Sequence, residues 1–199
     1  MAVRGTTPDL RMETGRTFPV LETERLLLRE TSMMDAKQVV AILNEPDIAK
    51  FYGFVEPMSR DMARNVIQKR HEKFEEGSLI RWTLARKEDN LCIGGIDVRF
   101  SNSEPGIARV GYEILSEFRG QGFMREALTE VIHYTFHRTQ VYRLEATVEP
   151  HNERSMGLVN RLGFVREGLL RQIGYWQGER HDLVMHSLLR SDNPMASEA

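Results

Sequence analysis

The sequence has little cysteine, no surplus of one charge and no long apolar run. Cys92 is the single cysteine in 199 residues, so no intramolecular disulfide can form, and we expect a reducing compartment. The 27 basic and 29 acidic side chains leave a formal net charge of −2. That balance argues against direct nucleic-acid or membrane partners. No apolar run approaches the roughly 20 residues that span a bilayer, and the N-terminal stretch lacks a signal-peptide pattern, so we predict a cytoplasmic protein.

The chain also lacks internal repeats, low-complexity blocks and a linker rich in Gly, Ser or Pro. Its 41% hydrophobic and 28% charged residues are typical of a globular protein and argue against disorder or a disulfide scaffold. We therefore expect one domain over residues 19–190, preceded by a flexible lead-in at 1–18 and followed by a flexible tail at 191–199.

Hydrophobic periodicity predicts a mixed α/β fold. The spacing of apolar residues predicts strands at 21–30, 79–85, 92–100, 107–115, 142–148, 164–170 and 183–189, and helices at 34–43, 59–75, 123–136 and 155–162. The three consecutive strands in the middle of the chain indicate an antiparallel meander. Asn44, Pro46 and Asp47 predict a turn after the first helix.

The segment GYEILSEFRGQGFMREAL at 111–128 runs from a strand through a glycine loop into an amphipathic helix. The first N–H groups of a helix lack internal acceptors and the helix dipole adds positive potential, so this loop can cradle an anion. Gly120 and Gly122 let the backbone approach a phosphate, and Arg119 adds charge. The pattern is neither a Walker loop nor GxGxxG, and the hexapeptide alone fits an ordinary strand-to-helix turn better.

Three segments in register resemble the Gcn5-related N-acetyltransferase (GNAT) superfamily. Residues 119–123 match its acyl-CoA-binding motif, from which Met124 departs because the last position is normally small. LETERLLLRE at 21–30 resembles the first strand of the RimJ/RimL-like branch, the ribosomal-protein N-terminal acetyltransferases. VEPHNERSMGLVNRLGFVREG at 148–168 resembles that branch's strand, Asn-containing loop, short helix and Gly-Phe ending.

The resemblance implies a GNAT-like acyl-CoA N-acyltransferase fold: a central, mostly antiparallel sheet with a splayed parallel strand pair, flanked by helices. It implies acetyl-CoA as co-substrate, with the pantetheine arm lying between the splayed strands, and no metal. The cofactor-binding residues implied by position are Ile114, Leu115, Arg119, Gly120, Gln121, Gly122, Phe123, Met124, Asn152 and Ser155.

The resemblance also assigns catalytic roles, in a reaction where an amine attacks the thioester directly. Ser155 stands where RimL-like enzymes place a hydroxyl beside the thiol, so we predict that it donates a proton to the thiolate; it equally suits the first turn of the short helix. Strand alternation lets Glu113 face the acceptor pocket as the general base, with Glu149 as a second candidate. Several relatives carry a carboxylate where this chain has Arg109.

The expected function is therefore transfer of acetyl from acetyl-CoA to a primary amine, foremost the N-terminal α-amino group of a protein or peptide of the ribosomal-protein type. A small amine such as an amino acid, polyamine or aminoglycoside is the alternative acceptor. A non-catalytic acyl-CoA-binding module is the alternative class, favoured by Met124 and by the missing carboxylate at Arg109. The sequences of the two loops expected to line the acceptor site, 44–60 and 171–182, do not decide between these functions. The sequence also leaves open whether the protein forms a homodimer.

Overall fold

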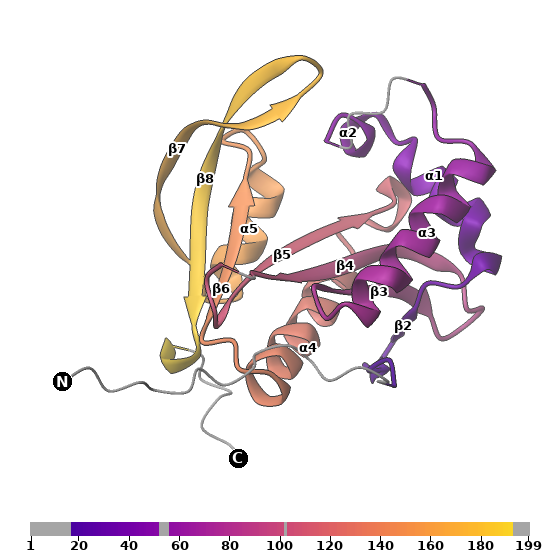
Figure 1. Ribbon diagram of the computed structural model, residues 1–199, viewed down its shortest axis with the longest axis horizontal. Coiled ribbons are helices and arrows are strands. Elements are labelled where there is room, and N and C mark those ends of the chain that lie inside the picture. The colour runs from indigo at the N-terminus through magenta and orange to yellow at the C-terminus, as the bar shows by residue number, and fades with distance from the viewer. Residues whose placement is uncertain (1–16, 52–55, 102, 193–199) are drawn as a thin grey trace.

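The structure is a computed structural model that describes residues 17–51, 56–101 and 103–192. Its centre is an eight-stranded sheet in the order β1-β2-β3-β4-β5-β6-β8-β7 (Figure 1). The strands are β1 (Leu21–Glu22), β2 (Leu26–Glu30), β3 (Leu79–Arg86), β4 (Cys92–Phe100), β5 (Ile107–Ile114), β6 (Arg143–Val148), β7 (Val165–Trp176) and β8 (Glu179–Leu189). The α-helices are α1 (Ala36–Leu43), α2 (Pro46–Ala49), α3 (Arg60–Glu75), α4 (Phe123–Arg138) and α5 (Glu153–Arg161).

Neighbouring strands are antiparallel except for β5 and β6, which are parallel. The helix α4 connects these two strands, as a parallel crossover requires. The predicted meander is confirmed as β3, β4 and β5. The structure thus has the mixed α/β architecture that the resemblance implied, with one parallel pair in a mostly antiparallel sheet.

The two faces of the sheet differ in polarity. The larger core packs the apolar side chains of β2 to β6 against α4 and α5, with Trp82, Ile96 and Leu128 fully or almost fully buried. A smaller core lies between α1, α3 and the opposite face, where Ile42 and Ile67 are buried. Strand alternation gives that second face several polar residues of β3 to β5, which become important for the candidate site.

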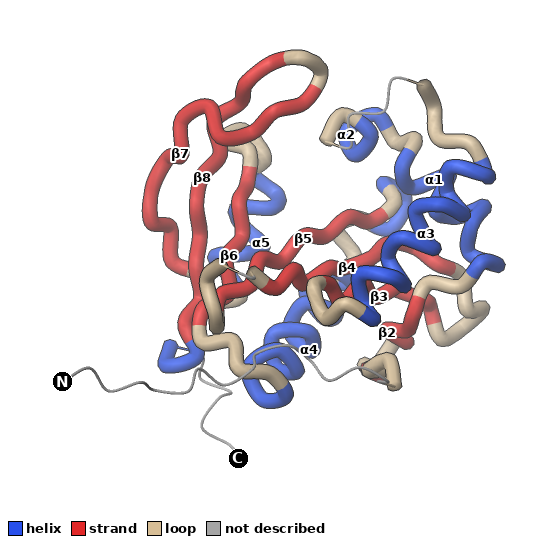
Figure 2. The backbone as a smooth tube through the Cα atoms, in the orientation of Figure 1, coloured by secondary structure: helices blue, strands red, loops and turns tan. Residues whose placement is uncertain are grey.

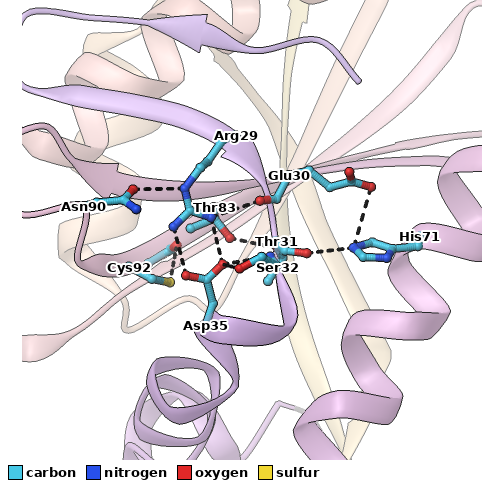
Figure 3. Close-up of polar contacts among 10 residues, drawn as sticks. Arg29, Glu30, Thr31, Ser32, Asp35, His71, Thr83, Asn90 and Cys92 are labelled. Carbon is cyan, nitrogen blue, oxygen red and sulfur yellow. Dashed lines mark hydrogen bonds and ion pairs between the residues drawn. The ribbon is translucent and has the colours of Figure 1, made fainter. Parts of the chain in front are cut away.

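A polar network ties β2 to the start of α1 on the second face (Figure 3). The guanidinium of Arg29 donates two hydrogen bonds to the carboxylate of Asp35, at 2.8 and 2.9 Å. The backbone N–H of Ser32 donates to the same carboxylate at 2.8 Å. The Thr83 hydroxyl donates to that of Thr31 at 2.8 Å, which joins β3 to the turn. These hydrogen bonds join β2, β3 and the start of α1 in one polar network.

The structure differs from the predicted elements between 21 and 49 and in the final hairpin, where β7 continues to Trp176 and β8 begins at Glu179, so that most of the predicted acceptor loop 171–182 is strand. The first predicted strand is divided, because the Thr23 hydroxyl accepts a hydrogen bond from the Leu26 N–H at 3.0 Å and forms a turn between β1 and β2. The predicted turn at 44–47 instead contains the short helix α2, whose first residue is Pro46. Proline suits that position because its φ is already helical and the missing N–H would have no acceptor there.

Residues 1–16 of the predicted lead-in and 193–199 of the predicted tail lie outside the described residues. Phe18, at the end of that lead-in, has its ring 5.0 Å from the ring of Phe74. The indole N–H of Trp82 donates to the Pro19 carbonyl at 2.7 Å. Across the described part of the chain, no helix is long and apolar enough to cross a membrane.

Candidate active site

The strands β5 and β6 pair only near their first residues and then separate. The parallel register joins Ile107–Arg109 to Arg143–Glu145 and ends there, although both strands continue (Figure 2). On its other side β5 stays paired with β4 as far as Ile114, and β6 stays paired with β8 as far as Val148. Each strand therefore has one free backbone edge facing the opening, and an extended ligand can hydrogen-bond to such an edge as an added strand does.

The predicted glycine loop lies at the end of β5 and leads directly into α4. Gly122 occupies the N-cap position in the left-handed conformation, with φ of 85°, and Gly120 has φ of 75°. Because a glycine N-cap has no side chain to accept a bond, the first N–H groups of α4 stay available to an external anion. A Cβ at Gly122 would lie 3.3 Å from the Arg25 guanidinium, so the cradle has no room for a larger residue without movement.

Met124, the residue that departs from the family motif, does not enter this cradle. Its side chain is buried in the larger core, as is that of Phe123. Both residues therefore present their backbone to the loop and their side chains to the protein interior. The large side chain at position 124 is tolerated because it points away from the loop.

A clamp formed by Arg25 and Glu126 holds the start of α4, and no local sequence pattern indicates it. The Arg25 guanidinium lies 2.6 Å from the Glu126 carboxylate, donates to the Gln121 carbonyl at 3.0 Å and sits 4.2 Å over the Phe123 ring. The Arg25 backbone N–H also donates to Glu126 at 2.8 Å. Two of the motifs that carried the resemblance, the first strand and the glycine loop, are thus physically one unit.

Arg119 connects the same loop to α2. Its guanidinium contacts Glu45 at 2.7 Å and also pairs with Asp47, and its Nε donates to the Ile114 carbonyl at 3.1 Å. The Ser116 N–H donates to Glu45 at 2.8 Å. Hydrogen bonding from Arg119 lowers the pKa of Asp47. The positive charge that we expected beside a phosphate is therefore shared with two carboxylates.

The segment around α2 also reaches the far side of the opening. The Lys50 ammonium contacts Glu149, just after β6, at 2.8 Å. The ring of Phe51 packs edge-on against Trp176 at 5.1 Å, and Trp176 stacks on His181 at 4.0 Å. Glu149, a candidate base, is therefore ion-paired. Residues 52–55 of the predicted acceptor loop lie outside the described residues.

Asn152 and Ser155 meet at the start of α5. The Asn152 side-chain oxygen accepts a hydrogen bond from the Ser155 backbone N–H at 3.0 Å, so Asn152 is the N-cap of this helix. The neighbouring phenol of Tyr112, on β5, is buried beside the Ser155 hydroxyl. Burial raises the pKa of Tyr112, and the Ser155 hydroxyl opposes that rise. Ser155 therefore lies in the first turn of α5, beside Tyr112 of β5, and its role as proton donor stays a prediction.

Glu113 points to the second face of the sheet, as alternation predicted, and is held there. Its carboxylate accepts hydrogen bonds from both terminal nitrogens of Arg81, one of them at 3.2 Å. Both side chains are almost completely buried. Both oxygens of this carboxylate are therefore engaged by one guanidinium group. The same Arg81 lies 3.4 Å from Asp97, a buried carboxylate that the sequence analysis did not single out.

Cys92 lies on β4 and is buried away from the glycine loop. Burial raises the pKa of its thiol to about 11, so the thiolate is scarce at neutral pH. A buried, protonated thiol is a poor nucleophile, so Cys92 agrees with direct transfer of the acetyl group to the amine rather than with an acyl-cysteine intermediate. Among the described residues, no group of three or more His, Cys, Asp or Glu side chains is arranged to hold a metal ion.

Comparison with known proteins agrees with this architecture. A family model described as an acetyltransferase (GNAT) domain matches residues 25–165. An uncharacterized N-acetyltransferase of Bacillus subtilis (strain 168), YoaA, is 32% identical over 87% of this chain and 98% of the relative. The [ribosomal protein uS5]-alanine N-acetyltransferase of Escherichia coli (strain K12) is 33% identical over 61% of this chain and 63% of the relative. The crystal structure of a probable acetyltransferase superposes with a TM-score of 0.78 at 27% identity, covering 88% of this chain and 99% of that one.

Proposed function

The chain belongs to the GNAT acetyltransferase family, and on that premise we propose that it moves the acetyl group of acetyl-CoA to the α-amino group of a protein or peptide N-terminus. The observation that carries the donor assignment is the opening between β5 and β6, with a glycine N-cap at its end. The opening offers two free backbone edges to the amide-containing pantetheine arm. The glycine loop offers helix N–H groups to the diphosphate.

The residues at the opening fit this donor without a net basic surface. The chain carries a formal charge of −2, and the guanidinium groups of Arg25 and Arg119 are each paired with carboxylates. Anion binding then rests on fixed N–H groups, which are already oriented and need no rearrangement. Changes to the backbone conformation of the loop should therefore affect the donor more than removal of a single charge.

The region around α2 and the tip of the β7–β8 hairpin supports a polypeptide acceptor. Phe51 and Trp176 bring an aromatic surface to the mouth of the opening, and Lys50 and Glu149 bring polar groups beside it. The N-terminus of a polypeptide entering here passes between α2 and the β7–β8 hairpin, with its α-amine first. The E. coli relative acts on an alanine of ribosomal protein uS5, which supports an N-terminal α-amine as the acceptor.

Such an amine makes modest demands on the protein. Its pKa of about 8, compared with about 10.4 for a lysine side chain, means that a single carboxylate suffices to remove the proton near neutral pH. We assign Ser155 the donation of a proton to the departing thiolate, because it lies at the start of α5 beside the opening. Tyr112, buried next to Ser155, is placed to orient its hydroxyl.

The proposal is tested with acetyl-CoA and a panel of acceptors, measuring release of free CoA. The panel contains peptides that begin with alanine or serine, the same peptides with blocked N-termini, a peptide whose only amine is a lysine side chain, and small amines. We expect turnover with the free α-amine peptides, and mass spectrometry should place the acetyl group on the first residue. Turnover confined to small amines would overturn the acceptor assignment, and donor binding without any turnover would overturn the enzymatic one.

A further inference from the structure

The short helix α2 is fastened to the end of β5 through Glu45, the residue at its N-cap position. The Glu45 carboxylate accepts hydrogen bonds from the Ser116 N–H at 2.8 Å and from the Ser116 hydroxyl at 3.0 Å. It also accepts one from the Arg119 guanidinium at 2.7 Å. The backbone carbonyl of Glu45 accepts the N–H of Ala49 at 2.7 Å, so the same residue begins the helix. The Glu45 side chain is 17% exposed, so these bonds form largely out of water.

The other end of the same segment contacts the far side of the opening. The Lys50 ammonium donates to Glu149, which directly follows β6, at 2.8 Å. The Phe51 ring packs edge-on against Trp176, the last residue of β7, with 5.1 Å between the ring centroids. Figure 1 shows α2 between the end of β5 and the β7–β8 hairpin. Residues 45–51 therefore bridge the two sides of the opening, at a level where β5 and β6 are no longer paired.

The position of α2 depends on these contacts, because the helix is too short to be stable by itself. It has four residues, fewer than a helix needs to overcome its unfavourable nucleation. Its base is fixed by Asn44, whose side chain accepts the Met58 N–H at 2.7 Å and donates to the Met58 carbonyl at 3.0 Å. Ile48 packs into the smaller core. Loss of the Glu45 contacts should therefore free α2 from the turn at 116–119 without unfolding the domain.

A ligand on either side of the opening acts on this one segment. In the proposed function, the diphosphate of the donor binds the loop that Arg119 begins, and the peptide enters beside Phe51 and Trp176. We propose that Glu45 is a positioning residue that couples the two substrates through α2, so that each binds more tightly when the other is present. This inference rests on the proposed function. Coupling of this kind is reciprocal, because both orders of binding lead to the same ternary complex.

The test measures the coupling directly, with CoA and a peptide that begins with alanine. CoA lacks the acetyl group, so the ternary complex cannot react, and calorimetry gives the peptide Kd with and without saturating CoA. For the wild type we expect CoA to lower the peptide Kd about tenfold, which is within the usual range of coupling between two sites. Glu45→Gln keeps an oxygen for the Ser116 N–H but loses the charge that holds Arg119, so this coupling ratio should fall to about two.

Two further readouts separate this role from a catalytic or purely structural one. At saturating acetyl-CoA, Glu45→Gln should raise the peptide KM about fivefold and leave kcat nearly unchanged, because Ser155 keeps its place. Lys50→Met breaks the contact with Glu149 at the other end of the segment. It should also lower the coupling ratio, while CoA alone binds with wild-type affinity.

Asp35→Asn is the matched control, because Asp35 is the N-cap residue of α1 as Glu45 is of α2. Its carboxylate likewise accepts hydrogen bonds from an arginine, Arg29, and from a backbone N–H, that of Ser32. These contacts lie in the network of Figure 3, at the end of β2 rather than at the opening. Asp35→Asn should lower the melting temperature and leave the coupling ratio at its wild-type value.

A wild-type coupling ratio in Glu45→Gln would overturn the proposal. So would a wild type that acetylates the peptide but binds it equally well with and without CoA, and the proposed function would then stand alone. Loss of CoA affinity with an unchanged ratio would also overturn it, because Glu45 would then serve the donor only. If the wild type acetylates small amines but no peptide, the proposed acceptor fails, and the same comparison with the accepted amine decides the role of Glu45. If the wild type acetylates no amine, both proposals fall.

Discussion

Two buried aspartates on the same face of the sheet show how its two halves differ. Asp35 and Asp97 are 5% and 4% exposed. Burial raises the pKa of Asp35, but two bonds from Arg29 and donation from Ser32 reverse the effect, so its pKa is lowered. Burial raises the pKa of Asp97, and its arginine contacts do not overcome the rise. Equal burial thus gives opposite acidity, because the number and geometry of hydrogen-bond donors differ.

The same contrast extends to the backbone around each residue. In the half under α1 and α3, β3 pairs with β2 over 82–86 and with β4 over 79–85, and the polar groups of Figure 3 are linked to one another. In the other half, β5 and β6 leave their facing edges unpaired beyond Arg109 and Glu145. Backbone groups at unpaired strand edges can pair with an extended ligand, which is the role that we propose for this opening.

The largest expected difference is in stability. Asp35→Ala removes one partner of a buried ion pair and should lower the free energy of unfolding by about 3 kcal/mol. Asp97→Ala should cost much less, because the ionised Asp97 is poorly compensated in the folded protein. Urea unfolding at pH 7 measures both. Equal losses in the two variants would show that the two acids are held in the same way, which would remove the contrast.

The second largest effect concerns the donor. Gly122→Val forces a branched side chain into a left-handed N-cap and toward Arg25, so acetyl-CoA affinity should fall at least tenfold. Gly178→Val is the control, because Gly178 has a similar φ of 79° but lies in the turn between β7 and β8. It should suffer a similar loss of stability and retain donor affinity. If calorimetry gave both variants the same affinity, the glycine loop would not be the anion site.

The smallest expected effect is on the pH dependence of stability, which should have opposite signs for the two aspartates. The folded pKa of Asp35 is lowered, so its stabilising contribution is present above the unfolded pKa of about 3.9 and is lost as the pH falls through the folded value. The folded pKa of Asp97 is raised, so stability is lost as the pH rises from about 3.9 through the folded value. Between pH 3 and 7, Asp97→Asn should gain stability relative to the wild type as pH rises, and Asp35→Asn should lose it. Parallel curves would contradict the assigned shifts.

The sequence predicted the order of the main strands and helices, the meander and the glycine loop, because each depends on local periodicity and turn residues. It missed α2, since Asn44, Pro46 and Asp47 are equally common in turns and at helix starts. It assigned Arg119 to the phosphate but not to Glu45 and Asp47, more than seventy positions earlier in the chain.

Contacts between residues far apart in the chain also explain why the sequence analysis missed the Arg25–Glu126 clamp and the Asp97 carboxylate. Arg25 and Glu126 are 101 positions apart, and no local pattern couples them. Asp97 occupies an ordinary alternating position of a strand; only the register that sets it opposite Gly111 shows where its carboxylate lies. The resemblance placed Ser155 and Asn152 at a helix start because that motif is local, and the structure confirms that local geometry.

The most direct test of the contrast is amide hydrogen exchange, resolved by residue, with and without acetyl-CoA. We predict that the donor slows exchange at alternate amides of the free edges, in 110–114 and 146–148, and at the start of α4. Exchange in 82–85, where β3 is paired on both sides, should not change. Protection that avoids both free edges, or that is uniform across the sheet, would contradict the account that the opening between β5 and β6 receives the donor.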